Sequence, residues 1–213
     1  SSCQCKKNSK NLLQGYLSDF AKYSGVINAS HIIHVFEAIP KQLAQFQDES
    51  VRKFKFGKVL PSSKGFHKIV GPLEWLEKAK LAIKTMPAAK AEEPLLAHTK
   101  PNCFKLYLFD VGLLQASLNV PIEHIVDQTL GSYKGYIAEN FVACKLFSNR
   151  FETLLSWFEG QAELEFLVHE GKNIVPIEVK SSGNFLRAKS LISFVDRYHP
   201  KRAIKLAPLN RGY

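Results

Sequence analysis

The sequence predicts a mixed α/β (α+β) protein with two domains, a helical, winged-helix-like domain over residues 1–102 and an α/β domain over residues 103–213. Three observations predict this organisation. Apolar residues recur at helical spacing through much of the first hundred residues. Short apolar runs separated by turn residues prevail from residue 153 onward, as expected for strands. Hydrophobic residues make up 46% and charged residues 23% of the chain, which is typical of folded globular proteins.

The first domain begins with a sequence pattern that predicts a helix, a turn and a second helix. Residues 15–47 predict two helices separated at residues 24–30, because apolar side chains return at helical spacing after that break. We expect Asn28 or Ser30 to cap the second helix, since a side-chain oxygen at that position can accept the free amides of a first turn.

An arm, a helix and a wing complete the first domain. Lysine alternates with phenylalanine in residues 52–60, which favours a short strand or extended arm with a cationic outer face. Residues 66–81 predict a helix that is kinked or restarted at Gly71-Pro72. Residues 79–85 and 94–100 predict two strands, and helices followed by such a pair are typical of a winged-helix domain.

The second domain is predicted to mix helices and strands. Asp110 is expected to cap a helix that begins at Val111, and residues 134–147 predict a strongly periodic helix. Five elements then follow in the order strand, strand, strand, helix, strand. They are expected at residues 153–158, 162–169, 173–180, 186–199 and 203–209.

The second and third of these strands predict a β-hairpin. Gly171 suits the first central position of a two-residue type II′ turn, where the backbone needs a positive φ. This turn sets Phe166 opposite Ile177, and the apolar residues of the two strands then match pair by pair. Regular alternation is expected to place Leu164 on one face of its strand and Leu167 on the other.

The same register gathers charged side chains on the second face, where Glu165 faces Glu178 and Glu163 faces Lys180. Two carboxylates set directly opposite, with Cβ atoms roughly 5 Å apart, repel each other, and a sheet normally avoids that pairing. A divalent cation removes the conflict, because Mg²⁺ is held by one or two carboxylates with water and phosphate. The pattern therefore predicts a Mg²⁺ site at Glu165 and Glu178, with Lys180 orienting the nucleophile for phosphodiester hydrolysis.

An ordinary hairpin is the alternative interpretation. The same glutamates and lysine would then form a solvated, partly ion-paired face, in which water tolerates one unfavourable Glu/Glu pair. The pattern alone leaves both interpretations open.

The motifs "AELEF" and "VPIEVK", preceded by "GYIAENFVACKL", resemble the PD-(D/E)XK nuclease superfamily, which has a restriction-endonuclease-like fold. That resemblance implies four catalytic residues, with Glu139 as the helix acid, Glu165 and Glu178 as metal ligands, and Lys180 as the lysine of E-x-K. It also implies a phosphate contact at Lys189 on the following helix. The superfamily most often has Asp where this chain has Glu165.

A wider resemblance runs nearly end to end. Segments such as "YLSDFAKYS", "VFEAIPKQLA", "LEWLEKAKL", "FKLYLFDVGLL" and "RAKSLISFVDRY" resemble the C-terminal region of bacterial and archaeal AAA-type P-loop ATPases. This resemblance implies an upstream ATPase domain of the same protein and a DNA-associated module with a metal-dependent nuclease site. It leaves open a catalytically inactive fold that binds DNA or a protein partner. The chain itself has no G-x-x-x-x-G-K-[ST] loop for binding ATP.

Charge favours a nucleic acid partner. Lys and Arg total 29 against 19 Asp and Glu, which gives a net charge of +10. Lys53, Lys55 and Lys58 are the predicted DNA contacts of the first domain, since lysines interleaved with phenylalanine can neutralise phosphates while the rings stack on bases. The alternative for this segment is a cationic edge strand that resists aggregation.

The sequence predicts a cytoplasmic protein. No apolar run approaches the ~20 residues that a membrane span needs. The chain begins without Met and without an apolar signal region, so we expect a piece of a longer cytoplasmic protein that makes no membrane contact.

Overall fold

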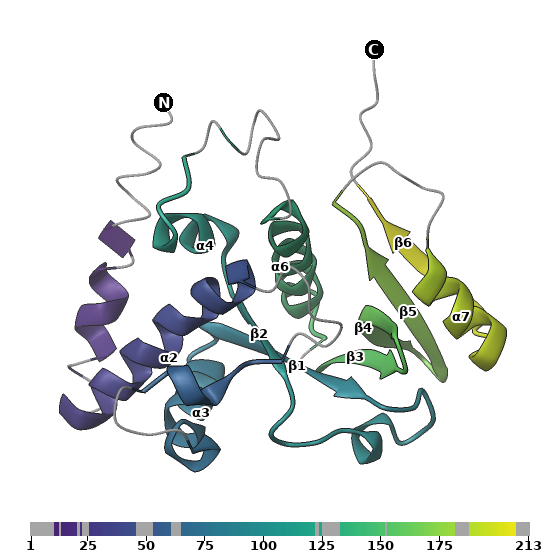
Figure 1. The fold of residues 1–213 in the computed structure, drawn as a ribbon, viewed down its shortest axis with the longest axis horizontal. Coiled ribbons are helices and arrows are strands. Elements are labelled where there is room, and N and C mark those ends of the chain that lie inside the picture. Colours follow the sequence, from purple (N-terminus) through teal and green to yellow (C-terminus); the bar gives the residue numbers. More distant parts are fainter. Residues whose placement is uncertain are drawn as a thin grey trace. The chain divides into compact units, whose positions relative to one another are not determined.

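A computed structural model of the protein describes residues 11–12, 14–20, 22, 26–45, 53–60, 65–121, 124, 133–151, 153–181 and 188–207. Figure 1 labels α-helices (α) and strands (β), and the 3₁₀ helices are named η. Their order and bounds are α2 Val26–Gln45, η1 Phe56–Lys58, η2 Phe66–Lys68, α3 Val70–Lys78, β1 Ala82–Ala88, η3 Leu95–His98, β2 Lys105–Leu108, α4 Val111–Ser117, α6 Tyr133–Ser148, β3 Leu154–Glu159, β4 Ala162–Glu170, β5 Asn173–Val179, α7 Lys189–Tyr198 and β6 Ile204–Leu206.

The strands form a mixed six-stranded sheet in the order β2-β1-β3-β4-β5-β6. Antiparallel pairing joins β3 to β4 and β4 to β5, whereas β1 pairs with β3 and β6 pairs with β5 in parallel. A parallel pair needs a crossover connection, and α7 lies in the chain between β5 and β6. The predicted α/β class and the order of three strands, a helix and a strand are therefore confirmed.

The chain divides into two compact units that interleave along the sequence. The first takes its residues from 1–47, 54–83 and 106–144, and the second from 48–53, 84–105 and 145–213. The predicted boundary between residues 102 and 103 falls inside one segment of the second unit and stays a prediction.

In the first unit the predicted helices are present with shifted starts. α2 begins at Val26, so the predicted cap at Asn28 or Ser30 is wrong, because both residues lie within the helix. α3 begins at Val70 and carries Pro72 in its first turn, where an amide hydrogen has no partner within the helix. None of the described helices is both long and apolar enough to cross a membrane.

The predicted strand at residues 94–100 is wrong, and the described part of residues 52–60, for which a strand or an extended arm is predicted, contains no strand of the sheet. Residues 56–58 form η1, and the side chain of Gln42 holds the preceding residue through the main chain of Lys55, with its Oε1 2.7 Å from Lys55 N and its Nε2 2.9 Å from Lys55 O. In residues 94–100 the element is η3, Leu95–His98, whose turn is closed by Ala97 N donating to Pro94 O at 2.9 Å. Local hydrogen bonds therefore replace sheet pairing in both segments, and the predicted wing has only its first strand, β1, among the described residues.

The second half of the chain follows its predicted pattern closely. Asp110 caps α4 as expected, with its Oδ1 accepting from Leu113 N at 2.8 Å. Gly171 has a φ of +62°, and residues Glu170 and Asn173 pair on either side of the turn. The predicted two-residue hairpin is thereby confirmed.

A β-bulge interrupts β4 where it pairs with β3. The register shifts between the pairs Leu155–Leu167 and Trp157–Leu164. Glu165 and Phe166 therefore stand together opposite Ser156, so β4 carries one residue more than its partner over this stretch. Such a bulge bends the strand and reverses the alternation of faces beyond it.

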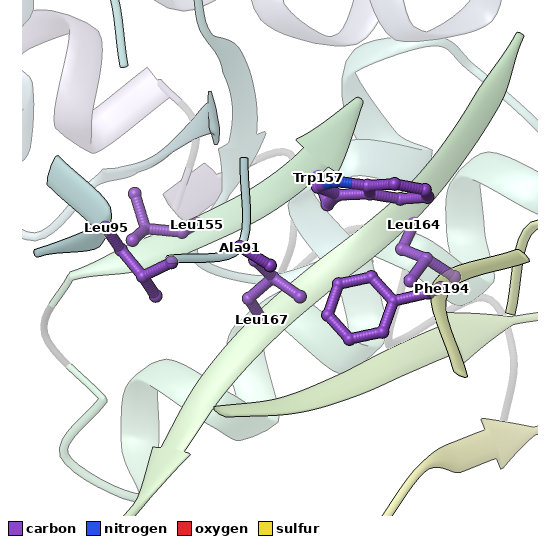
Figure 2. Packing of buried hydrophobic residues seen from close by; sticks show 7 residues of the cluster. All are labelled: Ala91, Leu95, Leu155, Trp157, Leu164, Leu167 and Phe194. Carbon is purple, nitrogen blue, oxygen red and sulfur yellow. The ribbon is translucent and has the colours of Figure 1, made fainter. Parts of the chain in front are cut away.

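A buried apolar cluster in the second unit shows the effect of the bulge (Figure 2). Leu164 and Leu167 both belong to it, so the prediction that they lie on opposite faces of the strand is wrong. The extra residue brings Leu167 back to the face of Leu164. The ring of Phe194 from α7 meets the indole of Trp157 edge-on, with ring centroids 5.1 Å apart. The members of the cluster are Ala91, Leu95, Leu155, Trp157, Leu164, Leu167 and Phe194.

Candidate functional site

The β4–β5 hairpin carries three of the predicted site residues. Phe166 pairs with Ile177 and Val168 pairs with Val175, which is the predicted register. The ladder between these strands is regular from the turn to the Phe166–Ile177 pair. The bulge of β4 lies just beyond that pair, at Glu165. Glu178 and Lys180 lie next to it, at the carboxyl end of β5.

Glu165 uses its side chain to complete the sheet. Its Oε2 accepts a hydrogen bond from Val179 N at 2.9 Å. Since the amide of Lys180 donates to Leu206 O of β6 at 2.8 Å, the amide of Val179 points the other way, toward β4. The carboxylate of Glu165 therefore lies between β4 and β5 and takes the place of a main-chain acceptor that the bulge has moved away.

Glu178 is a buried carboxylate with one open oxygen. The residue is 1% exposed, and its Oε1 lies 2.6 Å from Nζ of Lys180, whose side chain is 34% exposed. Its Oε2 is buried and has no hydrogen-bond partner within the part of the chain that the structure describes. A buried acceptor left without a partner costs about 1–3 kcal/mol, and more when it is charged. Oε2 of Glu178 is therefore an unusual feature of this end of the sheet.

Glu178 and Lys180 lie on the α7 face of the sheet. Ile174, on the same strand, packs against the buried cluster that includes Phe194 of α7. Regular alternation along β5 puts residues 174, 178 and 180 on one face. The short contact between Glu178 and Lys180 is consistent with this placement.

Glu163 lies on the opposite face, because its neighbour Leu164 belongs to the buried cluster. Its Oε1 is 2.5 Å from Nζ of Lys105, and the Lys105 side chain is buried. The prediction that Glu163 faces Lys180 is therefore wrong, since the two side chains lie on opposite faces of the sheet and have different partners. Glu163 is engaged in a structural pair and does not take the place of Glu165.

Glu139 belongs to the first unit. It lies on α6, is 4% exposed, and its Oε2 accepts a hydrogen bond from the Tyr107 hydroxyl at 3.1 Å. The next residue, Asn140, binds both main-chain groups of Leu108, through Oδ1 to Leu108 N at 2.9 Å and through Nδ2 to Leu108 O at 2.8 Å. The combination of Glu139 with Glu165 and Glu178 in one site stays a prediction.

The predicted DNA contacts are largely accessible. Lys53, Lys55 and Lys189 are exposed, and the side chain of Lys58 lies outside what the structure describes. Phe54, however, is only 5% exposed, so the expectation that this ring stacks on bases is wrong. The alternation of lysine and phenylalanine directs Phe54 into the core of the first unit and leaves the neighbouring lysines outside.

A cation at this site would have few protein ligands. Over the described ranges no three His, Cys, Asp or Glu residues come together as a metal-binding group. Mg²⁺ commonly binds one or two carboxylates and keeps several waters. The carboxylates of Glu178 and Glu165 are hard oxygen donors of the kind that Mg²⁺ prefers, and their binding of one cation stays a prediction.

Sequence reasoning missed a further lysine, Lys205 of β6, which is the register partner of Glu178. It also missed Lys105, which is buried in a strand of otherwise apolar residues. A lysine inside such a short apolar run was the available signal for a buried partner.

A family model described as a domain of unknown function, DUF8612, matches residues 5–123. The matched segment ends before α6 and before the hairpin that carries Glu165 and Glu178. A search of curated proteins and a search of solved structures found no match to the chain.

Proposed function

The chain belongs to the family described as a domain of unknown function, DUF8612, and since that description names no activity, we propose from the site itself that the protein is a DNA-associated, metal-dependent phosphodiesterase. The observation that carries the proposal is the open Oε2 of Glu178, a buried carboxylate oxygen beside a lysine. A site of this kind needs a ligand to complete it.

Glu178 and Glu165 are the proposed holders of a divalent cation. Both offer hard oxygen atoms at the carboxyl end of the hairpin, as Mg²⁺ prefers. Such a cation polarises a phosphate and lowers the pKa of bound water.

Lys180 is proposed to orient the attacking water and to stabilise the charge that develops on phosphate. It is held 2.6 Å from Glu178 and is one-third exposed, so it can meet both the carboxylate and a substrate. The net charge of +10 favours a polyanionic substrate such as DNA.

The order of elements supports the nuclease-like part of the proposal. A helix, α6, precedes three antiparallel strands, a further helix, α7, and a parallel strand, β6. The resemblance to PD-(D/E)XK nucleases assigns an acid to the first helix and to each of the second and third strands, and Glu139, Glu165 and Glu178 lie in these elements.

The second candidate is a binding module without catalysis, attached to an ATPase domain of the same cytoplasmic protein. The ion pair between Lys180 and Glu178 favours it, because a lysine already neutralises the carboxylate. The expected wing lacks its second strand, so DNA binding in either candidate is proposed from charge and exposed lysines.

Cleavage assays separate the two candidates. The full chain is incubated at low salt with single- and double-stranded DNA and Mg²⁺ or Mn²⁺. We expect metal-dependent cleavage that Glu178→Gln and Lys180→Gln reduce by about 10²–10³-fold, the loss typical of one group that stabilises transition-state charge. Glu92→Gln, which removes one exposed carboxylate elsewhere in the same unit, is the charge-matched control.

The outcomes assign the function. Salt-sensitive DNA binding without cleavage, unchanged by Glu178→Gln, points to the binding module. If DNA is neither bound nor cleaved at low salt, a protein partner becomes the better proposal. Glu139→Gln tests whether the helix acid supports the cation, as the resemblance implies.

A further inference from the structure

The candidate site has a second lysine on the neighbouring strand. In the parallel β5–β6 pair, Glu178 is the register partner of Lys205, and the pairs Ile177–Ile204 and Val179–Leu206 flank it. Residues paired in register leave a sheet on the same side. The Lys205 side chain therefore starts beside Glu178, on the face that also carries Lys180.

The pairing of β6 with β5 is fixed by neighbouring residue pairs and by a main-chain hydrogen bond after Lys205. The hydrogen bond from Lys180 N to Leu206 O, 2.8 Å long, continues the ladder past the last paired residue. The strand therefore cannot slip without breaking this bond, and a slip of one residue would turn Lys205 to the other face. The position of Lys205 next to Glu178 is a property of the sheet itself.

The ammonium of Lys180 is already engaged. Its Nζ lies 2.6 Å from Glu178 Oε1, so a phosphate oxygen that relied on Lys180 alone would compete with this carboxylate for the same donor. Besides the proposed divalent cation, a further positive charge next to Glu178 would reduce the repulsion between this carboxylate and a phosphodiester. Lys205 is the lysine whose strand position supplies it.

The same end of the sheet carries a third lysine. Glu163 N donates to Oγ of Ser190 at 3.2 Å, which ties the start of α7 to the start of β4. Because β4 and β5 are antiparallel, the start of β4 and the carboxyl end of β5 lie at one end of the sheet. Lys189, the first residue of α7, therefore belongs to the same end as Lys180 and Lys205.

We propose that Lys205 is a phosphate-binding residue of this site, an inference that rests on the proposed phosphodiesterase function. Lys205 donates a charge-assisted hydrogen bond to a non-bridging oxygen of the scissile phosphodiester, while Lys180 stays in contact with Glu178. Lys205 keeps its proton throughout, so its role is to position and neutralise the phosphate.

The test compares three lysine variants of the full chain. Lys205→Gln removes the donor, Lys205→Arg keeps the charge, and Lys201→Gln removes an exposed lysine that precedes the same strand at its other end. Three quantities are measured: Mn²⁺ affinity by calorimetry, DNA affinity in EDTA over a range of salt, and kcat and KM for Mn²⁺-dependent cleavage. Thermal unfolding by circular dichroism checks that each variant is folded.

We expect Lys205→Gln to lower kcat/KM by about 10- to 100-fold, the loss of one hydrogen bond to a charged group, mainly through KM. In EDTA its salt slope for DNA binding should fall by about 0.9, the value for one phosphate contact on duplex DNA. Mn²⁺ affinity should be unchanged. Lys205→Arg should retain most of the activity, and Lys201→Gln should resemble the wild type.

The inference and the function fail in different ways. If the wild type binds Mn²⁺ and cleaves DNA but Lys205→Gln matches Lys201→Gln, the inference is wrong and the function stands. Loss of Mn²⁺ binding or of folding in Lys205→Gln, with no rescue by Lys205→Arg, also overturns it, because Lys205 would then hold the site together rather than bind phosphate. If the wild type neither binds Mn²⁺ nor cleaves DNA, the proposed function falls and this inference with it.

Discussion

Each of the two compact units buries a glutamate, and the two carboxylates differ in their partners. Glu139 in the first unit is 4% exposed and accepts a hydrogen bond from a neutral donor, the Tyr107 hydroxyl. Glu178 in the second unit is 1% exposed, shares one oxygen with Lys180 and leaves the other open. Buried polar groups are almost always satisfied, so Oε2 of Glu178 is an exception, as are side-chain atoms of Thr85, Tyr133 and Trp157.

A third glutamate sharpens this contrast within the second unit. Glu163 pairs with the buried Lys105 on the opposite face of the sheet from Glu178. Its partner is held inside the structure, whereas Lys180 reaches solvent. The pair of Glu178 and Lys180 differs from it in leaving one buried carboxylate oxygen without a partner among the described residues.

Breaking the closed pair should have the largest effect on stability. Lys105→Met leaves the Glu163 carboxylate without its close cation, and removing one partner of a buried pair costs about 3–5 kcal/mol. Because Glu163 is partly exposed, we expect a loss near the lower end, about 3 kcal/mol. Urea denaturation measures it, with Lys172→Met on the exposed hairpin turn as control. A loss no larger than that of the control would mean that the pair is not structural.

Removing the neutral donor from Glu139 should have an intermediate effect. Tyr107→Phe deletes the hydroxyl and keeps the ring, so we expect the free energy of unfolding to fall by about 1.5–2 kcal/mol, near the lower end of the range for a hydrogen bond to a charged group. Tyr198→Phe, which removes a less buried hydroxyl that donates to Glu159, should cost less than 1 kcal/mol, roughly the value of an ordinary hydrogen bond. The same urea titrations compare them, and equal losses would contradict the difference in burial.

Glu178→Gln should change stability least of the buried substitutions. The open oxygen has no described partner to lose, and the amide removes a buried charge, while the lost pair with the one-third-exposed Lys180 is worth at most about 1 kcal/mol. We expect a net change within about 0.5 kcal/mol by urea denaturation. A loss above about 2 kcal/mol would place Glu178 among the structural glutamates and remove the main support for the proposed site.

An exposed glutamate gives the smallest effect and a defined pH dependence. The hydrogen bond with His169 lowers the pKa of Glu93 below its ordinary value of 4.5. A carboxyl with a lowered pKa stabilises the fold above its unfolded pKa, and this contribution is lost as pH falls through the folded value. The difference in urea midpoint between wild type and Glu93→Gln should therefore be small at pH 6 and disappear as pH falls through the lowered pKa of folded Glu93. A difference that grows on acidification would contradict this sign.

Sequence pattern predicted the hairpin because two local signals agreed. Gly171 marks the turn, and the alternating apolar residues on either side match in only one register. The contact between Glu178 and Lys180 follows from their spacing of two on one strand. The bulge was not predictable, since the run "LEFL" offers an apolar residue to the core in either phase.

Contacts between residues far apart in the sequence could not be predicted from local sequence patterns. The pair Lys105 and Glu163 joins residues far apart in the chain, and no period links them. In the first unit the alternation around Phe54 predicts a short strand or an extended arm, but the Gln42 side chain binds the main chain of Lys55 and takes the place of a strand neighbour. Side-chain mimicry of a sheet partner leaves no periodic signal in the sequence.

The side chain of Asn140 covers main-chain groups at the edge of the sheet. β2 is the outermost strand on its side, and an outermost strand presents unpaired main-chain groups that can recruit another polypeptide. At Leu108 the amide of Asn140 occupies both of these groups. A single side chain thus protects this border against self-association, and its loss would expose the protein to aggregation without touching any residue of the proposed catalytic machinery.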